Sequence, residues 1–150
     1  MSDQMSMGEE LLERYDVSLL EQRFLDLGIT LTKEQEIRFL QYYEYLVEKN
    51  KVMNLTAITE YEAVVEKHFA DSLAAAAVYD IGKAKSVIDV GTGAGFPGIP
   101  LKIVYPHLKI VLLDSLNKRV QFLNELISLL HLKDAQAVHG RAEDYAKKEE

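Results

Sequence analysis

The stretch that decides the fold reads Val87-Ile88-Asp89-Val90-Gly91-Thr92-Gly93-Ala94-Gly95-Phe96-Pro97-Gly98, and Leu112-Leu113-Asp114 follows it. Its first residues form an apolar strand that leads directly into a glycine-rich turn. A second apolar run ends in a carboxylate, Asp114, which stands 19 residues after Gly95. This spacing is typical of a nucleotide-like ligand bound at the carboxyl edge of a parallel sheet.

Strands and helices alternate around this stretch. Apolar runs predict strands over Ser86–Val90, Lys109–Asp114 and Ala135–His139. Helices are predicted between them, from Phe96 or Pro97 to Tyr105 and over Asn117–Leu130. Strand and helix repeats of this length form parallel βαβ units with right-handed crossovers, so the predicted fold class is α/β.

The residues before the first strand predict only helices. Three segments match the capping box, which satisfies free amides at a helix start: Ser18-Leu19-Leu20-Glu21, Thr32-Lys33-Glu34-Gln35 and Thr59-Glu60-Tyr61-Glu62. The second opens a helix over about 33–49, and the third opens a helix that continues through the alanines 74–77. We therefore expect a helical region over residues 1–80, packed on a sheet that belongs to residues 81–150.

Three strands are fewer than the five or more that a doubly wound fold usually has. We therefore expect residues 81–150 to form the first part of such a domain, truncated at its carboxyl end. An incomplete sheet also predicts weak or absent catalytic turnover.

The glycine-rich turn fits two ligand-binding patterns. Gly91-x-Gly93-x-Gly95, with Asp89 before it, is the pattern of S-adenosylmethionine-binding methyltransferases, whereas Gly93-x-Gly95-x-x-Gly98 matches the dinucleotide pattern. The dinucleotide pattern expects its first glycine directly after the strand, and here it comes two residues late and is followed by two prolines. This favours the methyl donor. In both cases Asp114 would accept hydrogen bonds from ribose hydroxyls.

These motifs carry a resemblance to a known family. The chain resembles the bacterial small-subunit ribosomal RNA guanine-N7 methyltransferases, also called the glucose-inhibited division protein B family, from about residue 50 to 145. The segments that match are Asn54-Leu55-Thr56-Ala57-Ile58, His68-Phe69-Ala70-Asp71-Ser72, Ile88 to Leu101, Asp114-Ser115-Leu116-Asn117-Lys118-Arg119 and Gly140-Arg141-Ala142-Glu143. The Gly-Phe-Pro-Gly-Ile-Pro segment is the most specific, because few methyltransferases place two prolines there.

The resemblance implies a class I, Rossmann-like methyltransferase fold with S-adenosylmethionine as methyl donor. It implies a guanine of 16S ribosomal RNA, free or within the 30S subunit, as acceptor. It places Asp114 at the ribose, Gly91 and Phe96 at the cofactor, and Ala142 and Glu143 near its adenine. Together with the glycine pattern, the expected cofactor-binding residues are Gly91, Thr92, Gly93, Gly95, Phe96, Asp114, Ala142 and Glu143.

Methylation at guanine N7 requires no general base, because the nitrogen lone pair attacks the methyl group and no proton leaves beforehand. Positioning then carries most of the rate, so no acid, base or nucleophile is expected among the residues. Asn54 and His68 are candidates for positioning. A structural hydrogen bond explains His68 equally well, and Asn54 also fits a polar loop between helices.

Basic residues follow the second and third strands, where the ligand crevice is expected to open. The candidates for phosphate contacts with RNA are Lys118, Arg119 and Arg141. Adjacent charges on a helix are also common on a solvated surface. Tyr42, Tyr43 and Tyr45 could stack on bases, but the sequence favours their packing the helices against the sheet.

Composition narrows the possible functions. Residues 1–50 carry −6 of the net charge of −7, and residues 101–150 carry +1, so the acidity does not exclude an RNA partner. The absence of cysteine excludes disulfides, thiolate metal sites and a cysteine nucleophile, and no metal is expected. Neither a signal peptide nor a membrane span is visible, so we expect a cytoplasmic monomer.

Two other functions stay open at this stage. A class I methyltransferase of small molecules or proteins would share the glycine pattern, but it would not account for the Gly-Phe-Pro-Gly-Ile-Pro and Asn-Leu-Thr segments. A non-catalytic or dinucleotide-binding domain would suit the net acidity.

Overall fold

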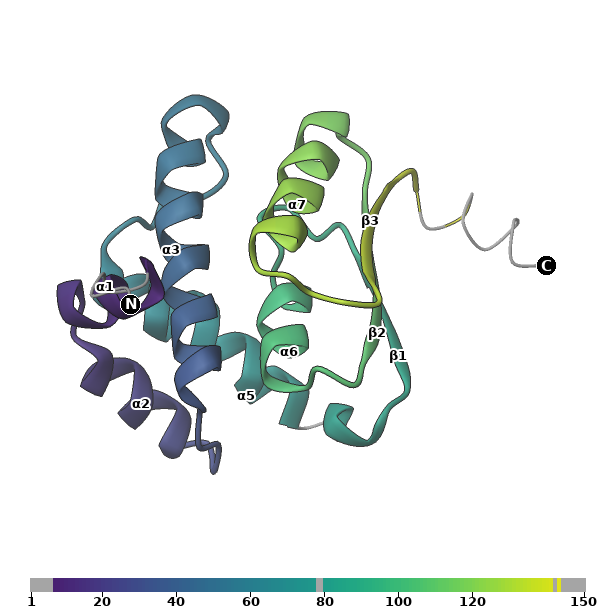
Figure 1. Ribbon diagram of the computed structural model, residues 1–150. Coiled ribbons are helices and arrows are strands. Elements are labelled where there is room, and N and C mark those ends of the chain that lie inside the picture. The colour runs from purple at the N-terminus through teal and green to yellow at the C-terminus, as the bar shows by residue number, and fades with distance from the viewer. Residues whose placement is uncertain (1–6, 78–79, 142, 144–150) are drawn as a thin grey trace, which may run out of the picture.

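The computed structural model describes residues 7–77, 80–141 and 143 (Figure 1). The elements before the sheet are α1 (Met7–Arg14), α2 (Val17–Leu25), α3 (Lys33–Met53), α4 (Tyr61–Val64), the π-helical η1 (Val65–Ala70), α5 (Asp71–Ala77) and the 3₁₀ turn η2 (Ile81–Lys83). The remaining elements are β1 (Ser86–Val90), α6 (Gly98–Val104), β2 (Lys109–Asp114), α7 (Asn117–Leu129) and β3 (Ala135–His139). The predicted order of elements is confirmed.

The three strands form one parallel sheet in the order β1-β2-β3. Ser86 is in register with Lys109 across β1 and β2, and Ile110 with Ala135 across β2 and β3. Parallel strands bring their carboxyl ends to one edge, so the turn after β1 lies beside the end of β2. The predicted α/β, Rossmann-like class is therefore confirmed.

The helices lie on one side of the sheet (Figure 1). α6 and α7 pack between the sheet and α3, and α1 and α2 lie on the far side of α3. On β1, the side chains of Ile88 and Val90 are 50% and 56% exposed. The described residues therefore cover this part of the sheet only partly.

A single apolar cluster joins the helical region to the sheet. The ring of Phe39 lies 4.9 Å from that of Phe24 and 5.0 Å from that of Phe69. Leu112 of β2 and Leu123 of α7 belong to the same cluster of buried side chains. The helices before residue 80 therefore share a core with the strands that follow.

One of the predicted capping boxes is confirmed. The hydroxyl of Thr32 accepts a hydrogen bond from the Gln35 N–H at 3.1 Å, and the Gln35 side chain accepts one from the Thr32 N–H at 2.8 Å. α3 continues to Met53, four residues beyond the predicted end. It stops where Asn54 adopts a left-handed conformation, with φ of 51°.

The other two capping boxes are wrong. α2 begins before Ser18, because the Asp16 carboxylate accepts the amide of Leu19 and acts as the N-cap. α4 begins after Glu60, and no side chain caps it, so Thr59 has no capping role. Among the described residues, no helix is both long and apolar enough to cross a membrane.

Candidate functional site

Backbone hydrogen bonds hold the glycine turn against the end of β2. The N–H groups of Gly91 and Thr92 both donate to the carbonyl oxygen of Leu113, at 2.8 and 3.3 Å. The N–H groups of Gly95 and Phe96 donate back to the carbonyl oxygen of Thr92, at 3.0 and 3.3 Å. The turn therefore closes on itself at the carboxyl edge of the sheet.

Gly91 and Gly93 present bare backbone to open space. Their φ angles are +69° and +59°, a region that residues with a side chain rarely adopt. A Cβ added at either position would meet no heavy atom within 4 Å. A ligand can therefore approach the main chain closely at these two residues, as the predicted cofactor contacts require.

Gly95 and Gly98 are surrounded by protein. A Cβ at Gly95 would lie 2.7 Å from the hydroxyl oxygen of Tyr42 and 2.9 Å from Ile99. A Cβ at Gly98 would lie 2.3 Å from Leu112. Both glycines are buried, so their missing side chains serve packing, and the predicted cofactor contact of Gly95 has no open space beside it.

A carboxylate stands at the start of α6. The Gly98 N–H donates to Asp89 Oδ2 at 3.0 Å, and burial raises the pKa of Asp89. The dinucleotide pattern would place a pyrophosphate at this helix start. Because the Asp89 carboxylate already accepts the amide at this helix start, its position disfavours that alternative. Thr92 beside it is buried.

Asp114 ends β2 and faces the glycine turn. Its Oδ2 accepts the Gly93 N–H and its Oδ1 accepts the Leu116 N–H, both at 2.9 Å. Each carboxylate oxygen has two lone pairs, so each retains one for a ribose hydroxyl. The side chain is only 2% exposed, and Arg119 Nη1 lies 3.7 Å from Oδ1. A ribose could reach Asp114 only if Arg119 or the turn moved aside.

His68 and Phe96 meet beside the turn. Their rings stack with centroids 4.4 Å apart and planes inclined by 12°. His68 lies in η1, and π-helical turns occur frequently at functional sites. Its Nε2 is 2.9 Å from the hydroxyl of Thr56. Burial lowers the pKa of His68 below its ordinary value of 6.5, although the charge of Asp71 acts in the opposite direction. The lowered pKa favours the neutral imidazole at pH 7.

The other predicted site residues are more exposed. Asn54 lies at the end of α3, two residues from Thr56, and Lys118 and Arg141 are exposed near the carboxyl edge of the sheet. Arg119 is partly buried by its pairing with Asp114, so it is not a free cation. Glu143 is exposed, and Ala142 lies outside the described residues.

The structure adds one residue to the site for which the sequence favoured packing. Tyr42 of α3 is fully buried, and its hydroxyl donates to the carbonyl oxygen of Ala94 at 2.6 Å. The two residues are 52 positions apart, so no local motif indicates this contact. The hydrophobic period of α3 could show only that Tyr42 points inward.

These features fit an adenosyl cofactor. Bare backbone lies beside a carboxylate with free lone pairs, which is the arrangement that a ribose and its neighbouring groups require. The residues that would hold S-adenosylmethionine are Gly91, Gly93 and Asp114.

The chain is similar to known proteins over most of its length. Residues 35–150 match the sequence model of the family GidB, described as rRNA small subunit methyltransferase G. The chain is 55% identical over 133 residues to ribosomal RNA small subunit methyltransferase G of Lachnoclostridium phytofermentans, an alignment that covers 89% of this chain and 55% of the relative.

Proteins of the same name from two other bacteria are similarly close. The relative from Macrococcus caseolyticus is 53% identical, covering 85% of this chain and 54% of the relative. That from Bacillus cereus is 54% identical, covering 88% and 54%. The chain thus spans about half the length of the curated relatives it matches.

Proposed function

This chain belongs to the GidB family, rRNA small subunit methyltransferase G, and from that premise we propose that it serves methyl transfer from S-adenosylmethionine to N7 of a guanine in 16S ribosomal RNA. The observation that carries the proposal is the open backbone at Gly91 and Gly93 beside the carboxylate of Asp114. Methyl transfer to a small molecule or protein is the alternative that the assays below distinguish.

The proposed roles follow from the contacts of each residue. When bound, S-adenosylmethionine supplies an electrophilic methyl group. Asp114 accepts hydrogen bonds from its ribose hydroxyls, and the main chain at Gly91 and Gly93 lies against it. Charge-assisted hydrogen bonds to a carboxylate are among the stronger ones, so Asp114 contributes most of the orientation.

His68 is proposed to support the site without taking a proton. The acceptor nitrogen of guanine carries a lone pair and no proton, so the residues need only hold donor and acceptor in line. A neutral imidazole does not repel the positively charged sulfonium, whereas an imidazolium would. Asn54, two residues before Thr56 in the chain, is proposed to act from the same side.

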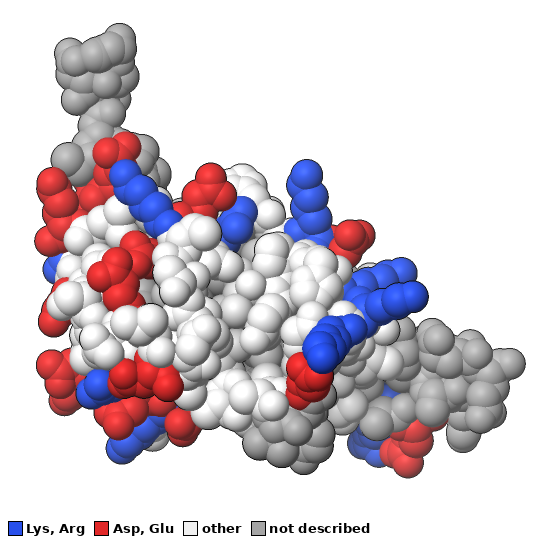
Figure 2. All heavy atoms as spheres, turned by 90° about the horizontal axis from the view of Figure 1, so that it is seen from below, with Lys and Arg blue, Asp and Glu red and all other residues white. Residues whose placement is uncertain are grey.

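Lys118 and Arg141 are proposed to contact RNA phosphates. Lys118 lies in the first turn of α7, where the helix dipole disfavours cations, and no acidic residue balances it there. Figure 2, which looks at the lower edge of the molecule, shows acidic side chains crowded over the helical region. A bound phosphate would relieve the repulsion at the start of α7 and be repelled by the helical region.

Calorimetry tests the cofactor. S-adenosylhomocysteine should bind the chain with one site, and NAD should not bind, because Asp89 occupies the helix start that a pyrophosphate needs. Binding of NAD in place of S-adenosylhomocysteine would overturn the assignment.

Labelled-methyl transfer tests the acceptor. The label should appear in 16S RNA or in 30S particles. Chemical depurination, which removes N7-methylguanine selectively, should then release the label. Transfer to protein or to a small molecule alone would favour the alternative. If S-adenosylhomocysteine binds but no methyl group is transferred, the cofactor site is intact and the chain lacks catalytic activity.

Salt-dependent binding tests the phosphate contacts. Lys118→Glu and Arg141→Glu should each weaken RNA binding and reduce the slope of log affinity against log salt by about 1. Lys51→Glu is a suitable control, because Lys51 is exposed on α3 and pairs with Glu48. An equal effect of all three changes would contradict the assignment of RNA phosphate contacts to Lys118 and Arg141.

A further inference from the structure

We propose that Tyr42 is a positioning residue for the cofactor turn, acting through the carbonyl group of Ala94 and the ring of Phe96. This rests on the proposed function, since it assigns the turn to S-adenosylmethionine. It gives the helical region a part in cofactor binding, because Tyr42 comes from α3.

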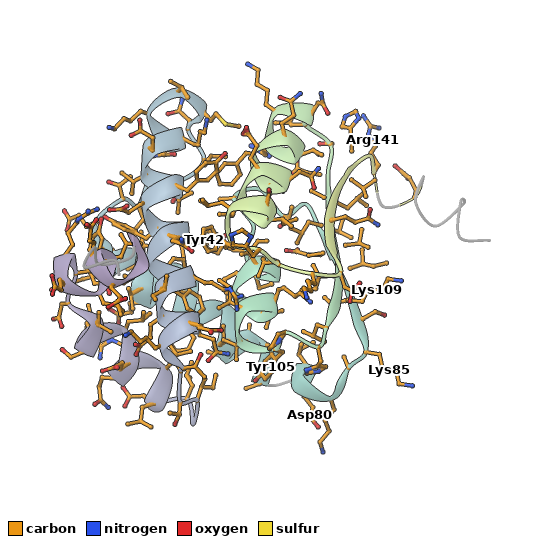
Figure 3. The ribbon with its side chains drawn as sticks, viewed as in Figure 1. Tyr42, Asp80, Lys85, Tyr105, Lys109 and Arg141 are labelled. Carbon is orange, nitrogen blue, oxygen red and sulfur yellow. The ribbon has the colours of Figure 1, made fainter. Side chains whose placement is uncertain are left out.

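The turn is held from two elements. The end of β2 holds its first half, through the Leu113 carbonyl and the Asp114 carboxylate, which accept the amides of residues 91–93. Its second half meets α3, where the hydroxyl of Tyr42 donates to the Ala94 oxygen at 2.6 Å. Figure 3 shows Tyr42 directed from α3 toward the sheet side of the molecule.

The fit between Tyr42 and the turn is close. A Cβ at Gly95 would stand 2.7 Å from the hydroxyl oxygen of Tyr42, which is too short for any contact between a methyl group and oxygen. The third glycine of the pattern therefore makes room for the tyrosine hydroxyl. Replacing either partner disturbs the other, since the two share one space.

The ring of Tyr42 holds the next residue. It stacks on Phe96 with centroids 5.5 Å apart and planes inclined by 22°, and Phe96 in turn stacks on His68. Three consecutive residues of the turn, Ala94 to Phe96, are thus located by one side chain of α3. Because Gly93 immediately precedes them, their position sets the direction of its amide beside Asp114.

Core packing alone does not explain a tyrosine here. Phenylalanine would fill the same volume without burying a hydroxyl, and a buried hydroxyl is costly unless it makes a hydrogen bond. Burial also raises the pKa of Tyr42, so its hydroxyl stays protonated and remains a donor. The hydrogen bond to the Ala94 carbonyl oxygen therefore explains why this position holds a tyrosine and not a phenylalanine.

The experiment compares Tyr42→Phe with Tyr45→Phe. Tyr45 lies on the same helix, stacks on Phe122 at 5.4 Å and donates its hydroxyl to Glu125 at 2.9 Å, so both changes remove one tyrosine hydrogen bond and keep one ring stack. Its partners lie on α7 and not in the turn. The readouts are the melting temperature, hydrogen exchange of amides 93–96, and affinity for S-adenosylhomocysteine.

Tyr42→Phe should melt a few degrees below the unchanged chain, and Tyr45→Phe should melt closer to it because its hydrogen bond is exposed. Only Tyr42→Phe should speed exchange at amides 93–96 and weaken S-adenosylhomocysteine binding, by about tenfold. Equal exchange and affinity in the two variants would overturn the proposal.

Two further arms keep the outcome decisive. If the unchanged chain does not bind S-adenosylhomocysteine, the proposed function fails, while exchange at amides 93–96 still decides whether Tyr42 positions the turn. If Tyr42→Phe does not fold, Gly95→Ala displaces the same hydroxyl together with the side chain of Ile99, and Gly28→Ala serves as its control for backbone strain. Gly28 has φ of +79° and open surroundings, so an alanine there introduces backbone strain without a steric clash.

Discussion

Gly91 and Gly93 have no heavy atom within 4 Å of where a Cβ would stand, whereas Gly95 and Gly98 each have two closer than 3 Å. The first pair leaves space for a ligand, and the second lets a helix and a tyrosine approach the turn. A glycine pattern in a sequence indicates that side chains are excluded, but not on which side. The neighbouring residues decide whether the excluded space belongs to ligand or to protein.

Gly93→Val is expected to abolish binding of S-adenosylhomocysteine, because the side chain enters the space beside Asp114. Gly28→Val is the matched control, since both glycines have positive φ and open surroundings. Each change should cost on the order of 1–3 kcal/mol of unfolding free energy through backbone strain. Denaturant titration measures that cost and calorimetry the affinity; loss of binding in both variants would point to strain and not to the ligand.

Asp114→Ala is expected to weaken S-adenosylhomocysteine binding by about 1–3 kcal/mol, through lost hydrogen bonds to the ribose. An analogue without the ribose 2′- and 3′-hydroxyls separates this from the loss of the Gly93 and Leu116 contacts. The analogue should bind the unchanged chain and the variant with similar affinity. If the variant lost the same factor for both ligands, Asp114 would shape the turn without touching the ribose.

Helix starts show why elements are easier to locate than their ends. Thr32 and Ser18 open the same four-residue pattern, yet only Thr32 caps a helix. Asp16 reaches the free amides of α2 first, so the hydroxyl of Ser18 donates to Asp16 instead. The competing cap lies two residues outside the motif. In η1, likewise, no residue pattern announces the change to π-helical geometry around His68.

Thr32→Ala is expected to lower the unfolding free energy by about 1 kcal/mol, because it removes the cap of α3. The change also loosens Gln35, whose amide donates to the carbonyl oxygens of Ile103 and Val104 at the end of α6. Ser18→Ala, which removes no cap, should cost less than about 0.5 kcal/mol. Urea denaturation of both variants checks the difference, and equal costs would contradict the assignment of Asp16 as the cap.

Glu36→Gln is expected to stabilise the protein above pH 7. Burial and a hydrogen bond with Glu21 raise the pKa of Glu36 to about 7, above the ordinary value of 4.5. The folded state therefore binds more protons than the unfolded state between these values, and stability is lost as the pH rises through 7.

Glutamine carries no charge at any pH, so the gain should be on the order of 1–3 kcal/mol at pH 8 and small at pH 4.5. The exposed Glu34 on the same helix provides the control, Glu34→Gln, which should show no such dependence. Melting temperatures across this range measure both variants. A gain that did not change with pH would exclude the shared proton between Glu21 and Glu36.

At the scale of the whole molecule, local patterns predicted the parallel sheet, its strands and the carboxylate that faces the turn. They could not predict contacts between distant segments. Tyr42 meets Ala94 and Phe39 meets Phe69 through packing, and Arg119 pairs with Asp114 because α7 starts beside the end of β2. Such contacts depend on how helices cross, which no short motif encodes. The division into residues 1–80 and 81–150 likewise depends on contacts between distant segments, and it stays a prediction.

Unfolding tests that division. Phe39 is fully buried between Phe24 and Phe69, in the cluster that also includes Leu112 of β2. Phe39→Ala should therefore lower the unfolding free energy by about 3–5 kcal/mol. Far-UV circular dichroism, which is dominated by the helices, and hydrogen exchange of the β2 amides should report the same loss. Leu25→Ala, at a side chain 56% exposed, should change neither by more than about 0.5 kcal/mol. Were the β2 amides to keep their protection in Phe39→Ala, the helical region would be an independent unit, and no side chain of α3 could hold the turn through the shared core.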